Sequence, residues 1–202
     1  MCFNFLGIRI EIKFLFVAVA ALLLLLDVSG VMLCAFLSSA VHELAHLAVL
    51  LAFKGEITAV TFEAFGIRIA RLDSLLFFEE LIVLLAGPLT NILVFFICGK
   101  AASQTVSLIG AVNLSIGIFN LLPVGALDGG RMASLILMTA LGENKGRCAS
   151  AMLSLLIIIP LFIAGVVLVL RPGHNFSLLL VCLFLAFGLV VELRAKNTQV
   201  MI

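Results

Sequence analysis

The sequence contains no tryptophan or tyrosine, and only 11% of its 202 residues are charged. A soluble globular domain is about 25% charged and about 45–50% apolar. Here apolar residues make up 64% of the chain, so too few polar side chains remain to cover a surface that faces water. This composition excludes an ordinary soluble domain and indicates a protein embedded in the lipid bilayer.

Basic clusters and paired cysteines are also missing. The net charge is +1 and no basic block occurs, so nothing in the sequence favours a nucleic-acid partner. The cysteines are odd in number and scattered singly, which excludes a disulfide framework and a cysteine-rich metal site. We interpret them as small buried apolar residues: Cys2, Cys34, Cys98, Cys148 and Cys182.

Long apolar segments predict an all-α polytopic membrane protein with about six transmembrane helices and short interfacial β-strands. The predicted helices span residues 14–30, 31–53, 81–98, 106–122, 149–170 and 176–191. The apolar stretch 132–141 is too short to cross a bilayer, so we expect it at or near the interface. Alternation of apolar and polar residues predicts a strand at 7–14 and a short hairpin over 58–62 and 66–69.

The distribution of cations predicts the orientation of the chain. With six crossings both termini lie on the same side, and every Lys and Arg except Lys100 and Arg171 then falls on that side. Because cytoplasmic loops carry the excess of Lys and Arg, we expect both termini in the cytoplasm.

The second apolar segment carries three ionisable residues in five positions, in the order His42-Glu43-Leu-Ala-His46. Residues four apart lie on one face of a helix, so both imidazoles can bind one metal ion. Glu43 follows the first candidate ligand directly, where its carboxylate can act as a general base. A catalytic zinc ion takes three protein ligands, so the pattern predicts one Zn²⁺ per chain and a third ligand from another helix.

The same short pattern also occurs by chance on solvated helices. In a lipid-embedded helix, however, each ionisable residue costs at least about 2.5–3.5 kcal/mol on insertion scales and usually faces an interior site. Placing two of the chain's three histidines in one apolar segment therefore favours a metal site.

Asp128 is the candidate third ligand. It follows Pro123 and precedes Gly129 and Gly130, and such irregular backbone near a membrane is tolerated where it lines a protein cavity. The predicted orientation brings His46 and Asp128 to the same cytoplasmic side. The alternative is an ordinary Asp-Gly turn in a loop, and the residues alone leave both interpretations open.

The combination of His42-Glu43-Leu-Ala-His46 with Asn120-x-x-Pro and Leu-Asp128-Gly-Gly resembles the site-2 protease family of intramembrane zinc metalloproteases. The small branch that includes stage IV sporulation protein FB is the nearest. The resemblance covers residues 7–131. It implies a single integral-membrane protease domain over 1–202, with its catalytic core at about 7–131 and C-terminal helices at about 149–191.

The resemblance further implies zinc held by His42, His46 and Asp128, with Glu43 as general base and proton donor. It implies hydrolysis of peptide bonds in or near transmembrane segments of membrane-tethered proteins, in a bacterial cell membrane, at a site that opens toward the cytoplasm. We expect the substrate to unwind locally, and it could add as a strand near Gly7 or Gly66. The resemblance leaves open whether the chain forms a homo-oligomer or binds a membrane regulatory partner.

The stretch Gly87-Pro88-Leu-Thr-Asn91 is similar to another family motif. We favour a structural interpretation, a Gly-Pro kink with a buried, hydrogen-bonded Asn91, over a catalytic role. Asn91 and Asn120 are accordingly candidates only for lining or supporting the site.

Other classes of function fit less well. A catalytically inactive membrane scaffold of the same fold is the main alternative, and the intact Glu43 disfavours it. A zinc transporter would need polar residues across the whole membrane, which the outer halves of the predicted helices lack. A haem site is disfavoured because His42 and His46 share one helix face and His174 is predicted to lie in an external loop.

Overall fold

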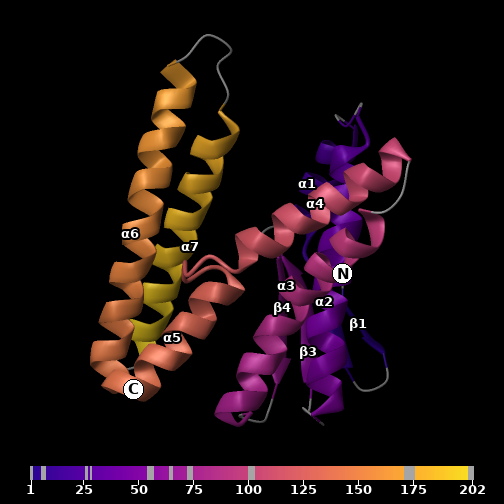
Figure 1. Ribbon diagram of the computed structural model, residues 1–202. Helices are drawn as coiled ribbons and strands as arrows, with labels where there is room; N and C mark the ends of the chain where they lie inside the picture. The colour runs from indigo at the N-terminus through magenta and orange to yellow at the C-terminus, as the bar shows by residue number, and fades with distance from the viewer. Residues whose placement is uncertain are drawn as a thin grey trace. The chain divides into compact units, whose positions relative to one another are not determined.

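The computed structural model describes residues 2–5, 8–25, 27, 29–53, 57–63, 66–71, 75–99, 103–170 and 176–199. These residues form seven helices and four strands in the order β1-β2-α1-α2-β3-β4-α3-α4-α5-α6-α7 (Figure 1). The chain divides into two compact units, Met1–Ile118 and Phe119–Ile202. Predictions that rest on the following residues lie outside the described ranges: Gly7, Lys54, Lys100, Arg171 and His174.

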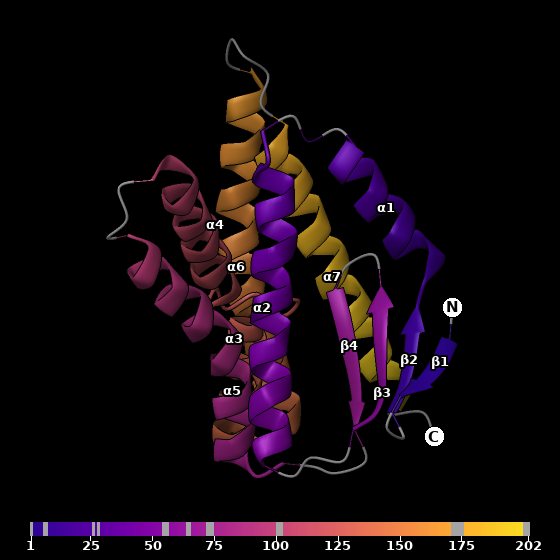
Figure 2. The ribbon, with the colours of Figure 1, turned by 90° about the vertical axis from the view of Figure 1, so that its right-hand side faces the viewer.

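The four strands of the first unit form one sheet in the order β1-β2-β3-β4 (Figure 2). They are β1 Cys2–Phe5, β2 Ile8–Ile12, β3 Ile57–Glu63 and β4 Gly66–Arg71. The pairs β1–β2 and β3–β4 are antiparallel, whereas β2 and β3 are parallel. Parallel neighbours need a long crossover, and α1 and α2 lie between β2 and β3 along the chain.

Strand β2 overlaps the strand that alternation predicts, and β3 and β4 occupy the predicted hairpin. Alternation within a segment does not identify its partner, so the sequence did not predict β1 or the parallel pairing of β2 with β3.

The helices that begin in the first unit are α1 Phe14–Leu25, α2 Val31–Ala52, α3 Phe77–Cys98 and α4 Gln104–Asn120. Helix α2 packs against α3. The buried side chains of α2 recur every fourth residue and so form one face of the helix: Ser38, His42, His46 and Leu50.

Helix α3 begins four residues before its predicted start. Glu79 lies in its first turn, and its carboxylate accepts a hydrogen bond of 2.9 Å from the Leu76 backbone N–H. An acidic residue in a first turn satisfies backbone donors and suits the helix dipole. The prediction started at Leu81 because it followed apolar residues alone.

The second unit contains α5 Asp128–Leu141, α6 Glu143–Leu170 and α7 Ser177–Gln199. Helices α6 and α7 run side by side (Figure 1). The core of the unit joins both helices to the segment before α5 and consists of Val124, Leu127, Ile158, Leu185 and Leu189. Helix α6 begins six residues before its predicted start, because the prediction left out its charged first turn.

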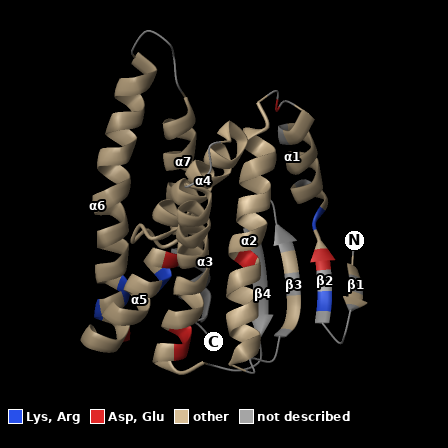
Figure 3. Ribbon diagram, turned by 45° about the vertical axis from the view of Figure 1, so that its right-hand side comes forward, with Lys and Arg blue, Asp and Glu red and all other residues tan. Residues whose placement is uncertain are grey.

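Three described helices, α2, α3 and α6, are long and apolar enough to cross a membrane. The apolar stretches Gln104–Asn120 and Ser177–Val191 are shorter, as is α1, so six crossings stay a prediction. Along α6, charged residues lie only near its beginning (Figure 3). Its exposed side chains beyond that point include Leu156, Phe162 and Leu170. Such helices suggest an integral membrane protein.

Candidate metal centre

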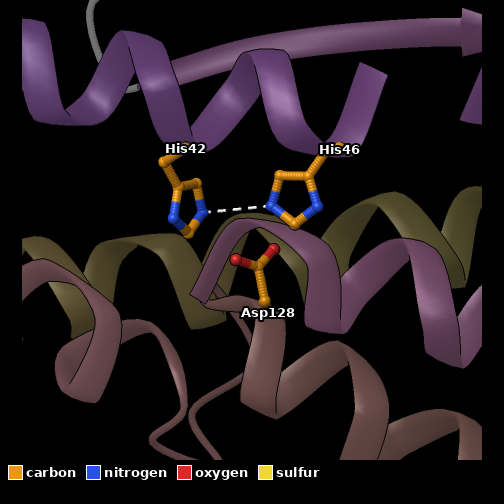
Figure 4. Close-up of side chains that lie close together, drawn as sticks. All are labelled: His42, His46 and Asp128. Carbon is orange, nitrogen blue, oxygen red and sulfur yellow. Dashed lines mark hydrogen bonds between the residues drawn. The ribbon is translucent and has the colours of Figure 1, made fainter. Parts of the chain in front are cut away.

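Two histidines project from the buried face of α2. His42 is 4% exposed and His46 is 8% exposed. Their Nε2 atoms lie 3.0 Å apart, and their ring centroids lie 4.7 Å apart at an interplanar angle of 80° (Figure 4). The i, i+4 spacing that the sequence shows therefore brings one nitrogen of each ring together at a buried point.

A backbone carbonyl sets the proton position on His46. The Nδ1 atom of His46 lies 2.6 Å from the Val83 oxygen, which belongs to α3. A carbonyl oxygen can only accept, so Nδ1 carries the proton and the neutral ring keeps a lone pair on Nε2. A hydrogen bond from the outer ring nitrogen to a carbonyl is the common support for a metal-binding histidine.

Gly87 lies opposite the two rings. A Cβ atom at this position would lie 2.4 Å from Nε2 of His46 and 2.7 Å from Nε2 of His42. Any side chain here would occupy the point where the nitrogens converge. The Gly-Pro kink interpretation overlooked this contact, since a single sequence does not show which helix packs against the histidines.

The histidine pair fits zinc. In a tetrahedral site with Zn–N bonds of about 2.0–2.1 Å, two ligand nitrogens lie roughly 3.3 Å apart. The observed separation of 3.0 Å is close to this value, and neutral imidazole is a favoured zinc ligand. Glu43, the next residue after His42, is half-buried on the same helix.

Asp128 is the first residue of α5 in the second unit and is 8% exposed. The two glycines after it explain how the preceding turn packs. A Cβ at Gly129 would lie 2.2 Å from the Leu121 oxygen, and one at Gly130 would lie 2.0 Å from the Val124 oxygen. The Asp-Gly-Gly sequence therefore allows the backbone before α5 to fold tightly against its first turn.

The candidate lining residues differ in their environments. Asn91 on α3 is 0% exposed, and neither atom of its amide has a hydrogen-bond partner among the described residues. The expected hydrogen bond of a buried structural Asn91 is thus not found there. Asn120 is half-buried at the last position of α4.

One buried polar pair was not predicted. The side-chain amide of Asn113 on α4 donates a 2.8 Å hydrogen bond to the Ser38 hydroxyl, which lies one turn before His42. Ser38 and Asn113 are each 2% exposed. Their positions four residues from His42 and Gly117 could have indicated that they face inward.

Comparisons with known proteins agree with these features. Residues 98–164 match the family model described as Peptidase family M50. The chain is 33% identical over 135 residues to stage IV sporulation protein FB of Bacillus subtilis. That alignment covers 63% of this chain and 47% of the relative. It is 27% identical over 216 residues to a zinc metalloprotease of Methanocaldococcus jannaschii. That alignment covers 98% of this chain and 61% of the relative. The chain thus spans less than two thirds of the length of either relative.

A solved structure of the site-2 protease from Methanocaldococcus jannaschii has a similar fold. The TM-score is 0.71 at 24% identity, and the match covers 95% of this chain and 94% of the other. Helices α6 and α7, which lay outside the motif resemblance, fall within a match of this extent. Together the comparisons confirm that this chain resembles the membrane zinc metalloproteases of the site-2 protease type in peptidase family M50.

Proposed function

We propose that this chain is an intramembrane zinc metalloprotease that hydrolyses peptide bonds in or near transmembrane segments of membrane-tethered proteins. The convergence of two buried imidazole nitrogens, 3.0 Å apart on an apolar helix, carries the proposal. Two histidines are costly to bury in such a helix unless they serve an interior site. One relative is named as a zinc metalloprotease, which gives independent support.

His42, His46 and Asp128 are the proposed zinc ligands. His42 and His46 come together on α2 (Figure 4), and the similarity to a zinc metalloprotease supports a carboxylate as the third ligand. Two imidazoles and one carboxylate form a common catalytic zinc set, which leaves a further position for water or substrate. The ligands then come from α2 and α5, and the domain spans the whole of 1–202.

Glu43 is the proposed general base. When bound, zinc polarises the scissile carbonyl and acidifies the attacking water. The Glu43 carboxylate accepts a proton from that water and later donates it to the leaving amine. Asn91 and Asn120 line or support the site and take no proton.

The substrate reaches the site from the bilayer in a locally extended form. Strands β1 and β4 form the two edges of the described sheet, and an edge strand can accept an extended peptide through main-chain hydrogen bonds. The protein lies in a bacterial cell membrane with both termini in the cytoplasm, so the product leaves the site on the cytoplasmic side. This orientation rests on the positive-inside bias of the sequence.

Zinc content tests the ligand set. The protein would be purified in detergent as wild type, Glu43→Gln and Asp128→Ala, and zinc per chain would be measured after reconstitution. We expect about one zinc per chain in the first two, and a large loss in Asp128→Ala. A wild-type protein without zinc, or an Asp128→Ala protein that binds zinc like the wild type, would contradict the ligand set.

Proteolysis tests the activity separately. Wild type and Glu43→Gln would be incubated in proteoliposomes with a set of single-span substrates. Cleavage by the wild type alone supports the proposal, since Glu43→Gln keeps the zinc ligands. Cleavage by both variants, with contaminating protease excluded, refutes Glu43 as the base. A zinc-loaded wild type that cleaves no substrate of the set would favour the inactive scaffold.

A further inference from the structure

Ser154 is a fully buried hydroxyl in the apolar helix α6. Its exposed fraction is 0%. Its hydroxyl donates a 3.0 Å hydrogen bond to the Ser150 oxygen one turn earlier, and it accepts a 3.0 Å hydrogen bond from the Gly125 backbone N–H. The first bond stays within α6, because the Ser154 hydroxyl donates to a carbonyl of its own helix. The second one joins α6 to the irregular segment before α5.

That segment leads directly to Asp128. It is shaped by short-range backbone hydrogen bonds, including Val124 N–H to the Leu122 oxygen at 2.7 Å and Leu127 N–H to the Val124 oxygen at 2.8 Å. Only two residues, Ala126 and Leu127, lie between Gly125 and Asp128. A shift at Gly125 would therefore move the start of α5 and the carboxylate that it carries.

Helix α7 approaches the same segment from a different position. A Cβ at Gly188 would lie 2.8 Å from the Ala126 Cβ. Ala126 also packs against the buried core formed in part by Ile158 and Leu185. The segment is thus held by a hydrogen bond that Gly125 donates to α6 and by close packing against α7.

We infer that Ser154 is a positioning residue for the zinc site, acting through Gly125 on Asp128. The inference rests on the proposed function, because it requires Asp128 to be a zinc ligand. Without the Ser154 hydroxyl, the buried Gly125 N–H would lose its described acceptor. Because an unsatisfied buried donor is costly, the segment would shift to find another acceptor and would displace Asp128 from its ligand position.

Zinc affinity in Ser154→Ala tests the inference without recourse to activity. The dissociation constant would be measured on the full chain in detergent, by competition with a chromogenic chelator. We expect zinc binding roughly 5- to 150-fold weaker than in the wild type, the range for one unsatisfied buried donor. Ser150→Ala is the matched control, since Ser150 is buried on the same helix and no described hydrogen bond joins its hydroxyl to the segment. Its affinity should stay within about twofold of the wild type.

A double-mutant cycle separates positioning from general damage to the fold. In the Asp128→Ala background, Ser154→Ala should weaken zinc binding by less than about twofold, because the ligand on which it acts is gone. An equal loss in both backgrounds would overturn the inference and assign Ser154 a purely structural role. Should Ser154→Ala fail to fold, Ser154→Cys keeps the size of the side chain with a weaker acceptor, and it should show a smaller loss with the same dependence on Asp128.

The two proposals fail in different ways. If Asp128→Ala binds zinc like the wild type, the ligand set itself is wrong. If Asp128→Ala loses zinc while Ser154→Ala binds like the wild type, the ligand set stands and the positioning role of Ser154 is refuted.

Discussion

The backbone of Gly87 lies so close to His46 that a Cβ at position 87 would come within 2.4 Å of the His46 Nε2 atom. The same helix accepts the Nδ1 hydrogen bond of His46 through the Val83 oxygen, one turn earlier. Helix α3 therefore determines the surroundings of both ring nitrogens of His46. It accepts a hydrogen bond from Nδ1, and the missing side chain of Gly87 leaves space in front of Nε2. Glycine is needed here for close approach, because any larger residue would fill that space.

Replacing Gly87 with alanine should weaken zinc binding. The added methyl group must displace a ring or separate α2 from α3, and overpacking of this kind costs about 1–3 kcal/mol. We expect a zinc dissociation constant at least about fivefold higher, measured by chelator competition. Gly99→Ala, at the end of the same helix and away from the histidines, is the control. Wild-type affinity in Gly87→Ala would show that the rings have more space than the structure gives them.

Asn91→Leu should separate function from stability. Leucine is close to asparagine in size, and the substitution removes a buried amide that has no partner among the described residues. Removing an unsatisfied buried group gains about 1–3 kcal/mol, so the unfolding free energy should stay level or rise. Cleavage should fall if Asn91 lines the site. A drop in stability, measured by denaturant titration in mixed micelles, would instead support a structural hydrogen bond.

The Ser38–Asn113 hydrogen bond should couple α2 to α4. Hydrogen bonds between transmembrane helices contribute about 0.6 kcal/mol on average and about 1.7 at most. A double-mutant cycle with Ser38→Ala and Asn113→Ala should give a coupling energy in this range. A control cycle that combines Ser115→Ala with Asn113→Ala should give a coupling near zero, because the described hydrogen bond of the exposed Ser115 stays within its own helix. A zero value for Ser38 as well would mean that the bond contributes nothing to stability.

The parts of the site that could be predicted are those whose geometry depends on residues close together in the sequence. His42 and His46 could be paired from the sequence because four residues bring two side chains to one helix face. The apolar context then made an interior site the favoured reading of the pair. Asp128 was only a candidate on its residues alone, since a turn and a ligand have the same local signature.

Contacts between helices were not predictable in this way. The sequence predicts a kink at Gly87, and nothing in its apolar segment distinguishes Ser154 from its neighbours. The sequence around each residue is also what a purely structural role would give. The packing of α3 against α2 shows what Gly87 contacts, and the packing of α6 against the segment before α5 shows what Ser154 contacts. The start of α3 was misplaced for a related reason, because Glu79 satisfies a backbone donor rather than continuing the apolar pattern.

Asp27 should make the stability of the protein depend on acid pH. Its carboxylate accepts hydrogen bonds from the Leu33 N–H at 3.1 Å, in the first turn of α2, and from the Ser29 N–H and hydroxyl. Burial by itself would raise the pKa of Asp27, but the hydrogen bonds from Leu33 and Ser29 outweigh it, so the pKa lies below its ordinary value. The folded state thus favours the ionised form of this group.

The sign of the pH dependence follows from that shift. A carboxyl group with a lowered pKa stabilises the fold fully above its unfolded pKa of about 3.9, and the contribution is lost as the pH falls through the folded value. Wild type should therefore be more stable than Asp27→Asn at pH 7, and the difference should shrink below about pH 4. Because both proteins share all other acid-sensitive groups, including the zinc ligands, only the difference in unfolding free energy is informative. A difference that stays constant from pH 7 to pH 3 would mean that the Asp27 charge does not stabilise the start of α2, and that an amide oxygen caps it equally well.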